Sequence, residues 1–220
     1  MIRNIVLATL IFGLGLVGFQ AEASANLLSD AGFDTQAVAA IGWGTTPWWG
    51  GGGGANLQSG GGAWVTDAKA SSPSHSATAF LFGTDWAWAV IGQDVNGISG
   101  NTGYAASASF LRDADLTNAK AIFKIEWWDA GNSKIREDAG TVAFDNANAA
   151  NTWTLVSDQF TSPSNAVSAK YMISYAKDAG IDPGDIWVDN ANFDVVPEPA
   201  SLMLLGSGLL GLFGVTRKKK

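Results

Sequence analysis

Apolar and polar residues alternate with a period of two through most of the chain after residue 75. Such alternation turns one side chain inward and the next outward, as in a half-buried β-strand. The alternating segments are rich in β-branched and aromatic residues, and turn-forming residues separate them. The pattern predicts strands over the ranges 76–82, 86–95, 103–112, 120–129, 140–144, 152–160, 167–176 and 185–194.

Short strands at this spacing are typical of an all-β fold, either an antiparallel β-sandwich or a jelly roll. Between two of the predicted strands, the run 129–132 (Asp-Ala-Gly-Asn) is a hairpin signal. A helical period appears only over 35–40, and it is short. The sequence therefore predicts an all-β domain.

Alternation also sorts the aromatic residues between the two faces of a strand. In the segment 120–129, Phe123 and Trp127 share the face predicted to join the core, and Glu126 and Trp128 share the other. An aromatic ring can stack on the apolar face of a pyranose while charged neighbours bond its hydroxyl groups. Trp128 with Glu126 is therefore a candidate sugar platform.

The segment 42–62 differs from the rest because tryptophan and glycine predominate in it. Glycine fills 50–54 and 60–62, and we expect a loop or a pair of loops there because glycine weakens regular elements. Trp43, Trp48 and Trp49 precede the first glycine run. Since plain linkers rarely carry three tryptophans, we predict that this loop binds a ligand or acts as a lid. The alternative is a plain low-complexity linker.

Two further tryptophans, Trp86 and Trp88, lie on one face of the segment 86–95 together with Val90. They are buried if that face packs on the core, and available to a ligand if it is the binding face. The predicted ligand-binding residues are therefore Trp48, Trp49, Trp86, Trp88, Glu126 and Trp128.

Charge and composition exclude several classes of function. The 220 residues carry a formal net charge of −7 and no cysteine. The central domain over 26–195 holds eight Lys or Arg against eighteen acidic residues, and it lacks the clustered cations that a nucleic-acid partner requires. The absence of cysteine rules out thiol chemistry. His75, the single histidine, lies in a Ser/Pro-rich turn that offers little to a catalytic triad. We therefore predict that the protein is not an enzyme.

Both ends of the chain are predicted to be processing segments. Arg3 precedes an apolar stretch over 5–19, and small residues before Asn26 suit signal peptidase. We predict a signal peptide over 1–25 and one β-sandwich domain over 26–195.

The C-terminal end has three parts in a fixed order: a polar motif at 196–201, an apolar span at 202–216 and a basic tail at 217–220. A basic end resists translocation and stays cytoplasmic. At a rise of about 1.5 Å per residue the span reaches about 22 Å, short of the roughly 30 Å hydrocarbon core. We predict a transmembrane sorting helix that forms the chain's contact with the membrane.

This order of parts resembles the PEP-CTERM sorting signal of Gram-negative bacteria. The residues that carry the motif are Val196, Pro197, Glu198 and Pro199. The resemblance implies that a membrane protease, exosortase, cleaves near the motif and releases the protein to the cell surface or the extracellular matrix, usually alongside exopolysaccharide production. The alternative is an ordinary tail anchor.

The central domain resembles the galactose-binding-like jelly roll of many carbohydrate-binding modules. The residues that carry this resemblance are the opening 26–34, Trp153, 162–166 and 186–190. The resemblance implies a structural Ca²⁺ held by Asp34 and Asp189, with backbone oxygens completing the shell. Alternatively, Asp34 caps a turn and Asp189 hydrogen-bonds a loop.

Taken together, the sequence predicts an exported protein that associates with extracellular polysaccharide without catalysis. One alternative is a structural matrix protein that binds other copies of itself. A less favoured alternative is a glycoside hydrolase, for which Glu126 and Glu137 are the only glutamates of the central domain.

Overall fold

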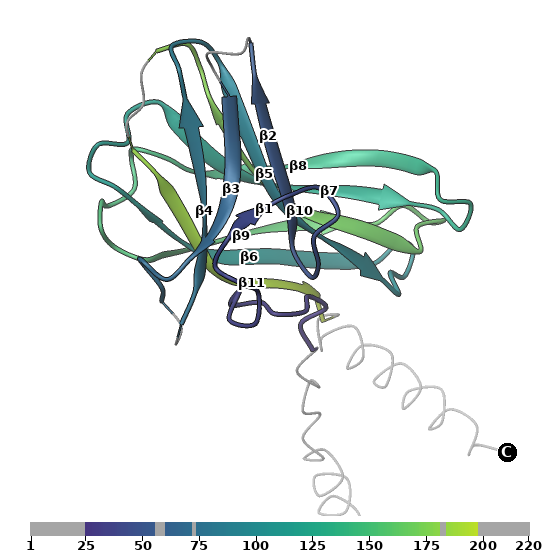
Figure 1. Ribbon diagram of the computed structural model, residues 1–220. Coiled ribbons are helices and arrows are strands. Elements are labelled where there is room, and N and C mark those ends of the chain that lie inside the picture. The colour runs from purple at the N-terminus through teal and green to yellow at the C-terminus, as the bar shows by residue number, and fades with distance from the viewer. Residues whose placement is uncertain (1–24, 56–59, 72–73, 181–183, 198–220) are drawn as a thin grey trace, which may run out of the picture.

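The computed structural model describes residues 25–55, 60–71, 74–180 and 184–197. Within these ranges two antiparallel sheets form a twisted sandwich (Figure 1). One sheet has six strands in the order β1-β3-β4-β11-β6-β9, and the other has five in the order β2-β5-β10-β7-β8. The strands are β1 (Ala40–Ile41), β2 (Trp49–Gly54), β3 (Gly60–Thr66), β4 (Ser76–Phe82), β5 (Ala87–Asn96), β6 (Gly103–Arg112), β7 (Ala119–Trp128), β8 (Lys134–Phe144), β9 (Thr154–Thr161), β10 (Ser168–Lys177) and β11 (Ile186–Val195).

The all-β prediction is confirmed, and every predicted strand is present. The main difference is β8, which begins at Lys134 and pairs there with Trp128 of β7. No residue in its first half is buried, because β8 is an edge strand, so alternation does not reveal it. The predicted hairpin turn is also present, and the Asp129 carboxylate accepts hydrogen bonds from the N–H groups of Gly131 and Ser133, each 2.9 Å long.

The core between the sheets is largely aromatic. Tyr104 and Phe193 stack with their ring centroids 5.2 Å apart, and the ring of Tyr171 lies 5.7 Å from that of Phe193. Trp127 is fully buried, and its indole N–H donates to the carboxylate of Asp138 over 2.7 Å. The predicted inward positions Phe123 and Trp127 are confirmed as core.

The prediction of a loop over 42–62 is wrong for the glycine runs, because these residues form parts of β2 and β3. β2 pairs with β5 and β3 pairs with β4, so the runs belong to different sheets. The two backbones approach so closely that a Cβ atom on Gly52 would press against the carbonyl oxygen of Gly61 and lie 2.7 Å from that of Trp88. Glycine is therefore required by close packing, although it weakens an isolated strand.

Asp158 joins the edges of the two sheets. It follows the buried Val156 on the inward side of β9, and its carboxylate reaches an irregularity in β8 between Ala139 and Ala143. There it accepts hydrogen bonds from the N–H groups of Thr141 and Val142. Burial raises the pKa of Asp158, but the backbone hydrogen bonds outweigh that effect and hold the pKa below its usual value.

Replacing Asp158 by asparagine is expected to lower the free energy of unfolding by about 1 to 3 kcal/mol, because hydrogen bonds to a charged acceptor are lost. A carboxyl whose pKa is lowered by folding stabilises the fold above its unfolded pKa of about 3.9, and this contribution is lost as the pH falls through the folded pKa. Urea unfolding at neutral and acidic pH checks both effects. The difference between wild type and variant should shrink in acid, and the exposed Asp115, changed to asparagine, is the control.

The first and last described segments lie side by side at one edge of the domain (Figure 1). The N–H of Leu27 donates to the carbonyl of Phe193 over 2.9 Å, and the N–H of Val196 donates to Gly103 over 2.9 Å. No helix within the described ranges is long and apolar enough to span a membrane. The predicted signal peptide over 1–25, apart from its last residue, and the predicted span over 202–216 lie outside those ranges.

Candidate functional site

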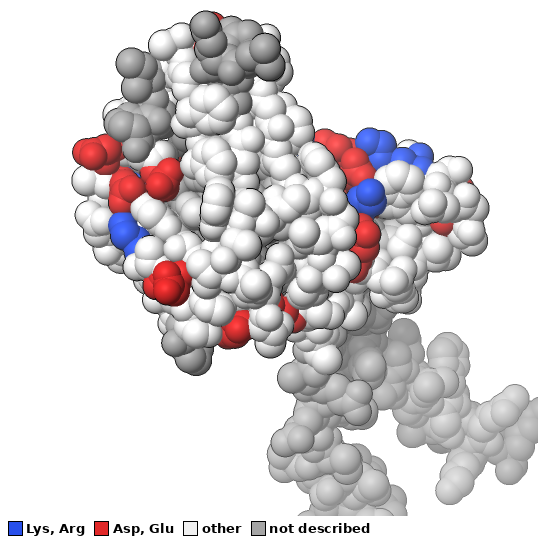
Figure 2. Space-filling view, viewed as in Figure 1, with Lys and Arg blue, Asp and Glu red and all other residues white. Residues whose placement is uncertain are grey.

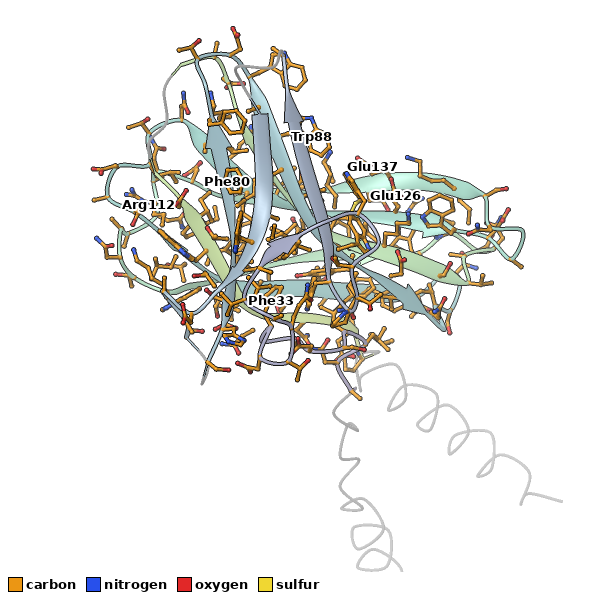
Figure 3. The ribbon with its side chains drawn as sticks, in the orientation of Figure 1. Phe33, Phe80, Trp88, Arg112, Glu126 and Glu137 are labelled. Atoms are coloured by element: carbon orange, nitrogen blue, oxygen red, sulfur yellow. The ribbon has the colours of Figure 1, made fainter. Side chains whose placement is uncertain are left out.

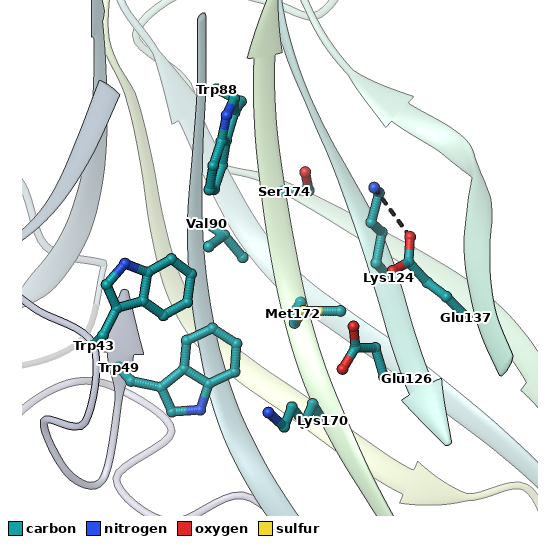
Figure 4. A pocket seen from close by; sticks show the side chains of 10 residues that line it. All are labelled: Trp43, Trp49, Trp88, Val90, Lys124, Glu126, Glu137, Lys170, Met172 and Ser174. Carbon is teal, nitrogen blue, oxygen red and sulfur yellow. Dashed lines mark ion pairs between the residues drawn. The ribbon is translucent and has the colours of Figure 1, made fainter. Parts of the chain in front are cut away.

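A groove of about 320 Å³ lies on the outer face of the five-stranded sheet. Its walls come from β2, β5, β10, β7 and β8, together with the turn before β2. Figure 4 shows tryptophan rings on one side and an ion pair on the other, with Met172 between them. We call it the tryptophan groove, and define it by Trp43, Trp49, Trp88, Glu126, Glu137 and Lys170.

The aromatic wall consists of three rings from separate places in the chain. Trp43 stacks on Trp49 with centroids 5.5 Å apart and an interplanar angle of 26°. Trp88 lies 6.5 Å from Trp43. Trp43 is 65% exposed, whereas Trp49 is almost covered. Trp43 therefore presents a ring face to solvent while its other face rests on Trp49.

Glycine lies beneath each of these rings. A Cβ atom on Gly51 would enter the ring of Trp43, and one on Gly92 would lie 2.5 Å from the ring of Trp49. The Trp88 ring lies over Gly53, 3.1 Å from where its Cβ would be. Because these positions carry no side chain, the rings can lie against the sheet with a face turned outward.

The floor of the groove is apolar. Trp49, Val90 and Met172 form a small buried cluster on the outer face of the sheet, with Trp88 packed against it. This cluster is separate from the core between the sheets. The cluster lines the groove from below and adds apolar surface to it.

The opposite wall carries paired charges from β7 and β8. Glu126 and Glu137 face each other across the two strands. The ammonium of Lys124 lies 3.2 Å from Glu137, and that of Lys134 lies 3.1 Å from Glu126. Both glutamates lie on the arm formed by β7 and β8, across the groove from Trp88 (Figure 3). On that arm acidic and basic side chains are interleaved, beside a largely uncharged surface (Figure 2).

Lys170 lies between two tryptophan rings. Its ammonium is 5.7 Å from the ring centre of Trp49 and 4.9 Å from that of Trp128. Contacts of this kind between a cation and a ring are worth about 0.5 to 1 kcal/mol at exposed sites. Lys170 therefore links the tryptophan groove to the neighbouring hollow, which Trp128 lines.

The structure brings together several of the predicted ligand residues. Trp49, Trp88 and Glu126 line the groove, and Trp128 lines the hollow beyond Lys170. Trp86 is 51% exposed but does not line this groove.

The prediction that Trp48 binds a ligand is wrong. Its ring is fully buried, lies 4.6 Å from that of Phe33, and donates its indole N–H to the carbonyl of Asp30 over 2.8 Å. Consecutive residues at the start of a strand point to opposite faces, so Trp49 turns outward while Trp48 turns into the core.

The predicted ligand residues did not include Trp43, Glu137 and Lys170, which line this site, although Trp43 lies in the loop predicted to bind a ligand. Lys170 shares its face of β10 with Met172, and alternation within that strand could have placed it outward. Trp43 lies in a turn, where no period exists. Its stacking on Trp49 could not have been read from the sequence.

The two predicted calcium ligands hold the same loop. The Asp34 carboxylate accepts hydrogen bonds from Ser74 and His75, and Asp189 accepts them from Ser71. The Ser74 hydroxyl contributes most to lowering the pKa of Asp34, with burial opposing it. Among the described residues no group of three or more acidic, His or Cys side chains could hold a metal ion. Both carboxylates are therefore hydrogen-bonded to the loop, and a bound calcium ion remains a prediction.

Comparison with known proteins identifies the C-terminal segment. Residues 195–218 carry the PEP-CTERM protein-sorting motif. The PEP-CTERM motif confirms the predicted sorting signal and implies export with sorting by an exosortase. The match begins at Val195, the last residue of β11, so the sandwich ends where the PEP-CTERM motif begins. No curated protein matches the chain by sequence.

Solved structures share the fold of the sandwich. The CBM22-1 xylan-binding domain of Xyn10C from Paenibacillus barcinonensis is 17% identical with a TM-score of 0.51, over 81% of this chain and 99% of that domain. The CBM22-1–CBM22-2 tandem of Xyn10C is 18% identical with a TM-score of 0.54, over 82% of this chain and 48% of the tandem.

The enzymatically active domain of tailspike protein 4 from bacteriophage CBA120 is 12% identical with a TM-score of 0.55, over 78% of this chain. The match spans only 21% of the tailspike chain. At these identities the comparisons establish only the fold. The domain that precedes the PEP-CTERM motif is a β-sandwich like those of carbohydrate-binding modules.

Proposed function

We propose that the chain is an exported protein that binds extracellular polysaccharide through the tryptophan groove and does not cleave it. The proposal is based on the three tryptophan rings, each of which lies over a glycine, and on the lysine–glutamate ion pairs opposite them. The PEP-CTERM motif supports delivery to the cell surface or matrix of a Gram-negative bacterium. A xylan-binding domain with the same fold supports the ligand class.

The chemistry of the groove suits a sugar ring. The exposed face of Trp43 and the ring of Trp88 can stack on the C–H face of a pyranose. Hydroxyl groups at the ring edge both donate and accept hydrogen bonds, so they can use lysine ammonium groups and glutamate oxygens together. The volume of about 320 Å³ is at the lower end of the range for ligand pockets, about 300 to 1,000 Å³.

Replacing Trp88 or Trp43 by alanine is expected to weaken polysaccharide binding by about 2 kcal/mol, or about thirtyfold, as for an aromatic hot spot. Calorimetry or affinity electrophoresis of the purified full chain with soluble xylan and with exopolysaccharide from the producing organism checks this. Trp64→Ala is the matched control, because that tryptophan is 43% exposed on the other sheet. Equal losses in all three variants would contradict a site in the groove.

Glycoside hydrolysis also requires two carboxylates in a groove, but here each glutamate forms an ion pair with a lysine. We propose that these pairs orient hydrogen bonds to hydroxyl groups. Release of reducing ends from xylan by the purified chain, abolished in both Glu126→Gln and Glu137→Gln, would overturn the non-catalytic assignment.

A second candidate function is self-association in the matrix, and an aromatic row on the six-stranded sheet favours it. Trp64, Phe80 and Phe82 follow one another with centroids 6.3 Å and 6.4 Å apart, and Phe82 is 48% exposed. Exposed apolar rows of this kind mark interaction surfaces. If this function is correct, the particle size will rise with protein concentration, and Trp64→Ala will abolish that rise without affecting polysaccharide binding.

A further inference from the structure

The tryptophan groove continues into two neighbouring hollows. Trp49 lines both the groove and a hollow of about 440 Å³ beside the turn before β2. Lys170 lines both the groove and the hollow of about 360 Å³ that contains Trp128. Asp94 lines both of these hollows. The three spaces therefore share walls around Trp49, Lys170 and Asp94, and they form one surface across the sheet.

Lys170 is the central charge of this surface. In the strand register it faces Asp94 on β5 and Glu126 on β7. No ion pair joins Lys170 to either carboxylate within 4.0 Å in the described part of the chain, and its ammonium lies over the two tryptophan rings. Its N–H donors remain available where the groove and the Trp128 hollow meet.

The charged residues that line the three spaces have no excess of positive charge. The cations are Lys124 and Lys170, and the carboxylates are Asp94, Glu126 and Glu137. The whole chain carries a net charge of −7. An anionic polymer would meet long-range repulsion from the chain and find no local excess of positive charge to offset it. Hydroxyl groups, in contrast, can use the donors and the acceptors equally.

We propose that this surface takes an uncharged glycan chain, with several sugar units in the groove and its two neighbouring hollows and with Lys170 donating to the unit between Trp49 and Trp128. The proposal rests on the proposed polysaccharide binding and adds the charge class and the length of the ligand. Lys170 is thereby a residue that determines specificity.

The test compares neutral and acidic probes on the purified full chain. Neutral oligosaccharides from xylan, galactan and β-glucan, from disaccharide to hexasaccharide, are titrated beside polygalacturonate. Titrations run at about 0.1 M and about 1 M NaCl, between which the screening length falls from about 10 Å to about 3 Å. For at least one neutral series we expect the affinity to rise about tenfold or more from disaccharide to hexasaccharide and to be the same at both salt concentrations. We expect polygalacturonate to bind more weakly than that series in low salt.

The variant Lys170→Met is expected to weaken binding of the longest neutral oligosaccharide about tenfold at both salt concentrations, because a hydrogen-bond donor is lost. Lys120→Met is the control, since that lysine lies on the same face of the sheet outside the three spaces. Tighter, salt-sensitive binding of polygalacturonate, or equal affinity for disaccharide and hexasaccharide, would overturn this proposal and leave polysaccharide binding intact. Failure of every probe would overturn the proposed function itself.

Discussion

Replacing Lys177 by methionine is expected to lower the free energy of unfolding by about 3 to 5 kcal/mol, because the buried ammonium has no substitute. Lys177 is only 3% exposed at the end of β10. Its ammonium donates to the carbonyl oxygens of Gly83, Asp85 and Gly180 over 2.9, 2.6 and 2.8 Å. It thereby ties the connection between β4 and β5 to the turn after β10.

Methionine keeps the length of the side chain but leaves these three carbonyl groups without their donor. The three carbonyl groups belong to half-buried residues, and an acceptor that loses its partner without gaining water costs about 1 to 3 kcal/mol. Urea unfolding followed by tryptophan fluorescence measures the loss, and the exposed Lys120, changed to methionine, is the matched control. Equal unfolding midpoints for the two variants would show that the ammonium has no structural role.

Replacing Gly52 by alanine is expected to destabilise the protein by about 3 kcal/mol or more, because the added methyl group meets backbone atoms that cannot rotate away. Its Cβ would press against the carbonyl oxygen of Gly61 and lie 2.7 Å from that of Trp88. The strands β2 and β3 would have to separate to admit it. Since β2 carries Trp49 and the glycines under Trp43 and Trp88, we also expect ligand binding to weaken.

The control for Gly52→Ala is Gly103→Ala, another glycine within a strand. A Cβ at Gly103 would find its nearest neighbour, a Val196 atom, at 3.6 Å, which is ordinary contact. Thermal unfolding of both variants compares the two positions. If Gly52→Ala is as stable as Gly103→Ala, close approach of the two sheets is not the reason for glycine in β2.

The glycines of β2 serve two faces of one strand. Gly50 and Gly52 face the other sheet, where a Cβ would meet Ala63 or the backbone of Gly61. Gly51 and Gly53 face the groove, beneath Trp43 and Trp88. A single run of one residue type therefore allows both the close packing of the sandwich and the seating of its outward tryptophans.

Much of the fold could be predicted from the sequence because the signals are local. Alternation in β4, β5, β6, β7, β9, β10 and β11 gave their bounds to within about two residues. Alternation failed in β2, where five of six residues are glycine, and in β3, which begins with three glycines, because glycine has no side chain to alternate. It also could not tell whether Trp88 faces the core or a ligand, since either face of a sheet can be buried.

The all-β class, the positions of most strands and the PEP-CTERM segment follow from the amino-acid sequence, because strand periodicity and a linear motif depend only on neighbouring residues. The sequence does not show that Trp48 is core while Trp43 and Trp49 form a wall, or that Lys170 lies between Trp49 and Trp128. Those placements follow from strand order and register, which join residues far apart in the chain.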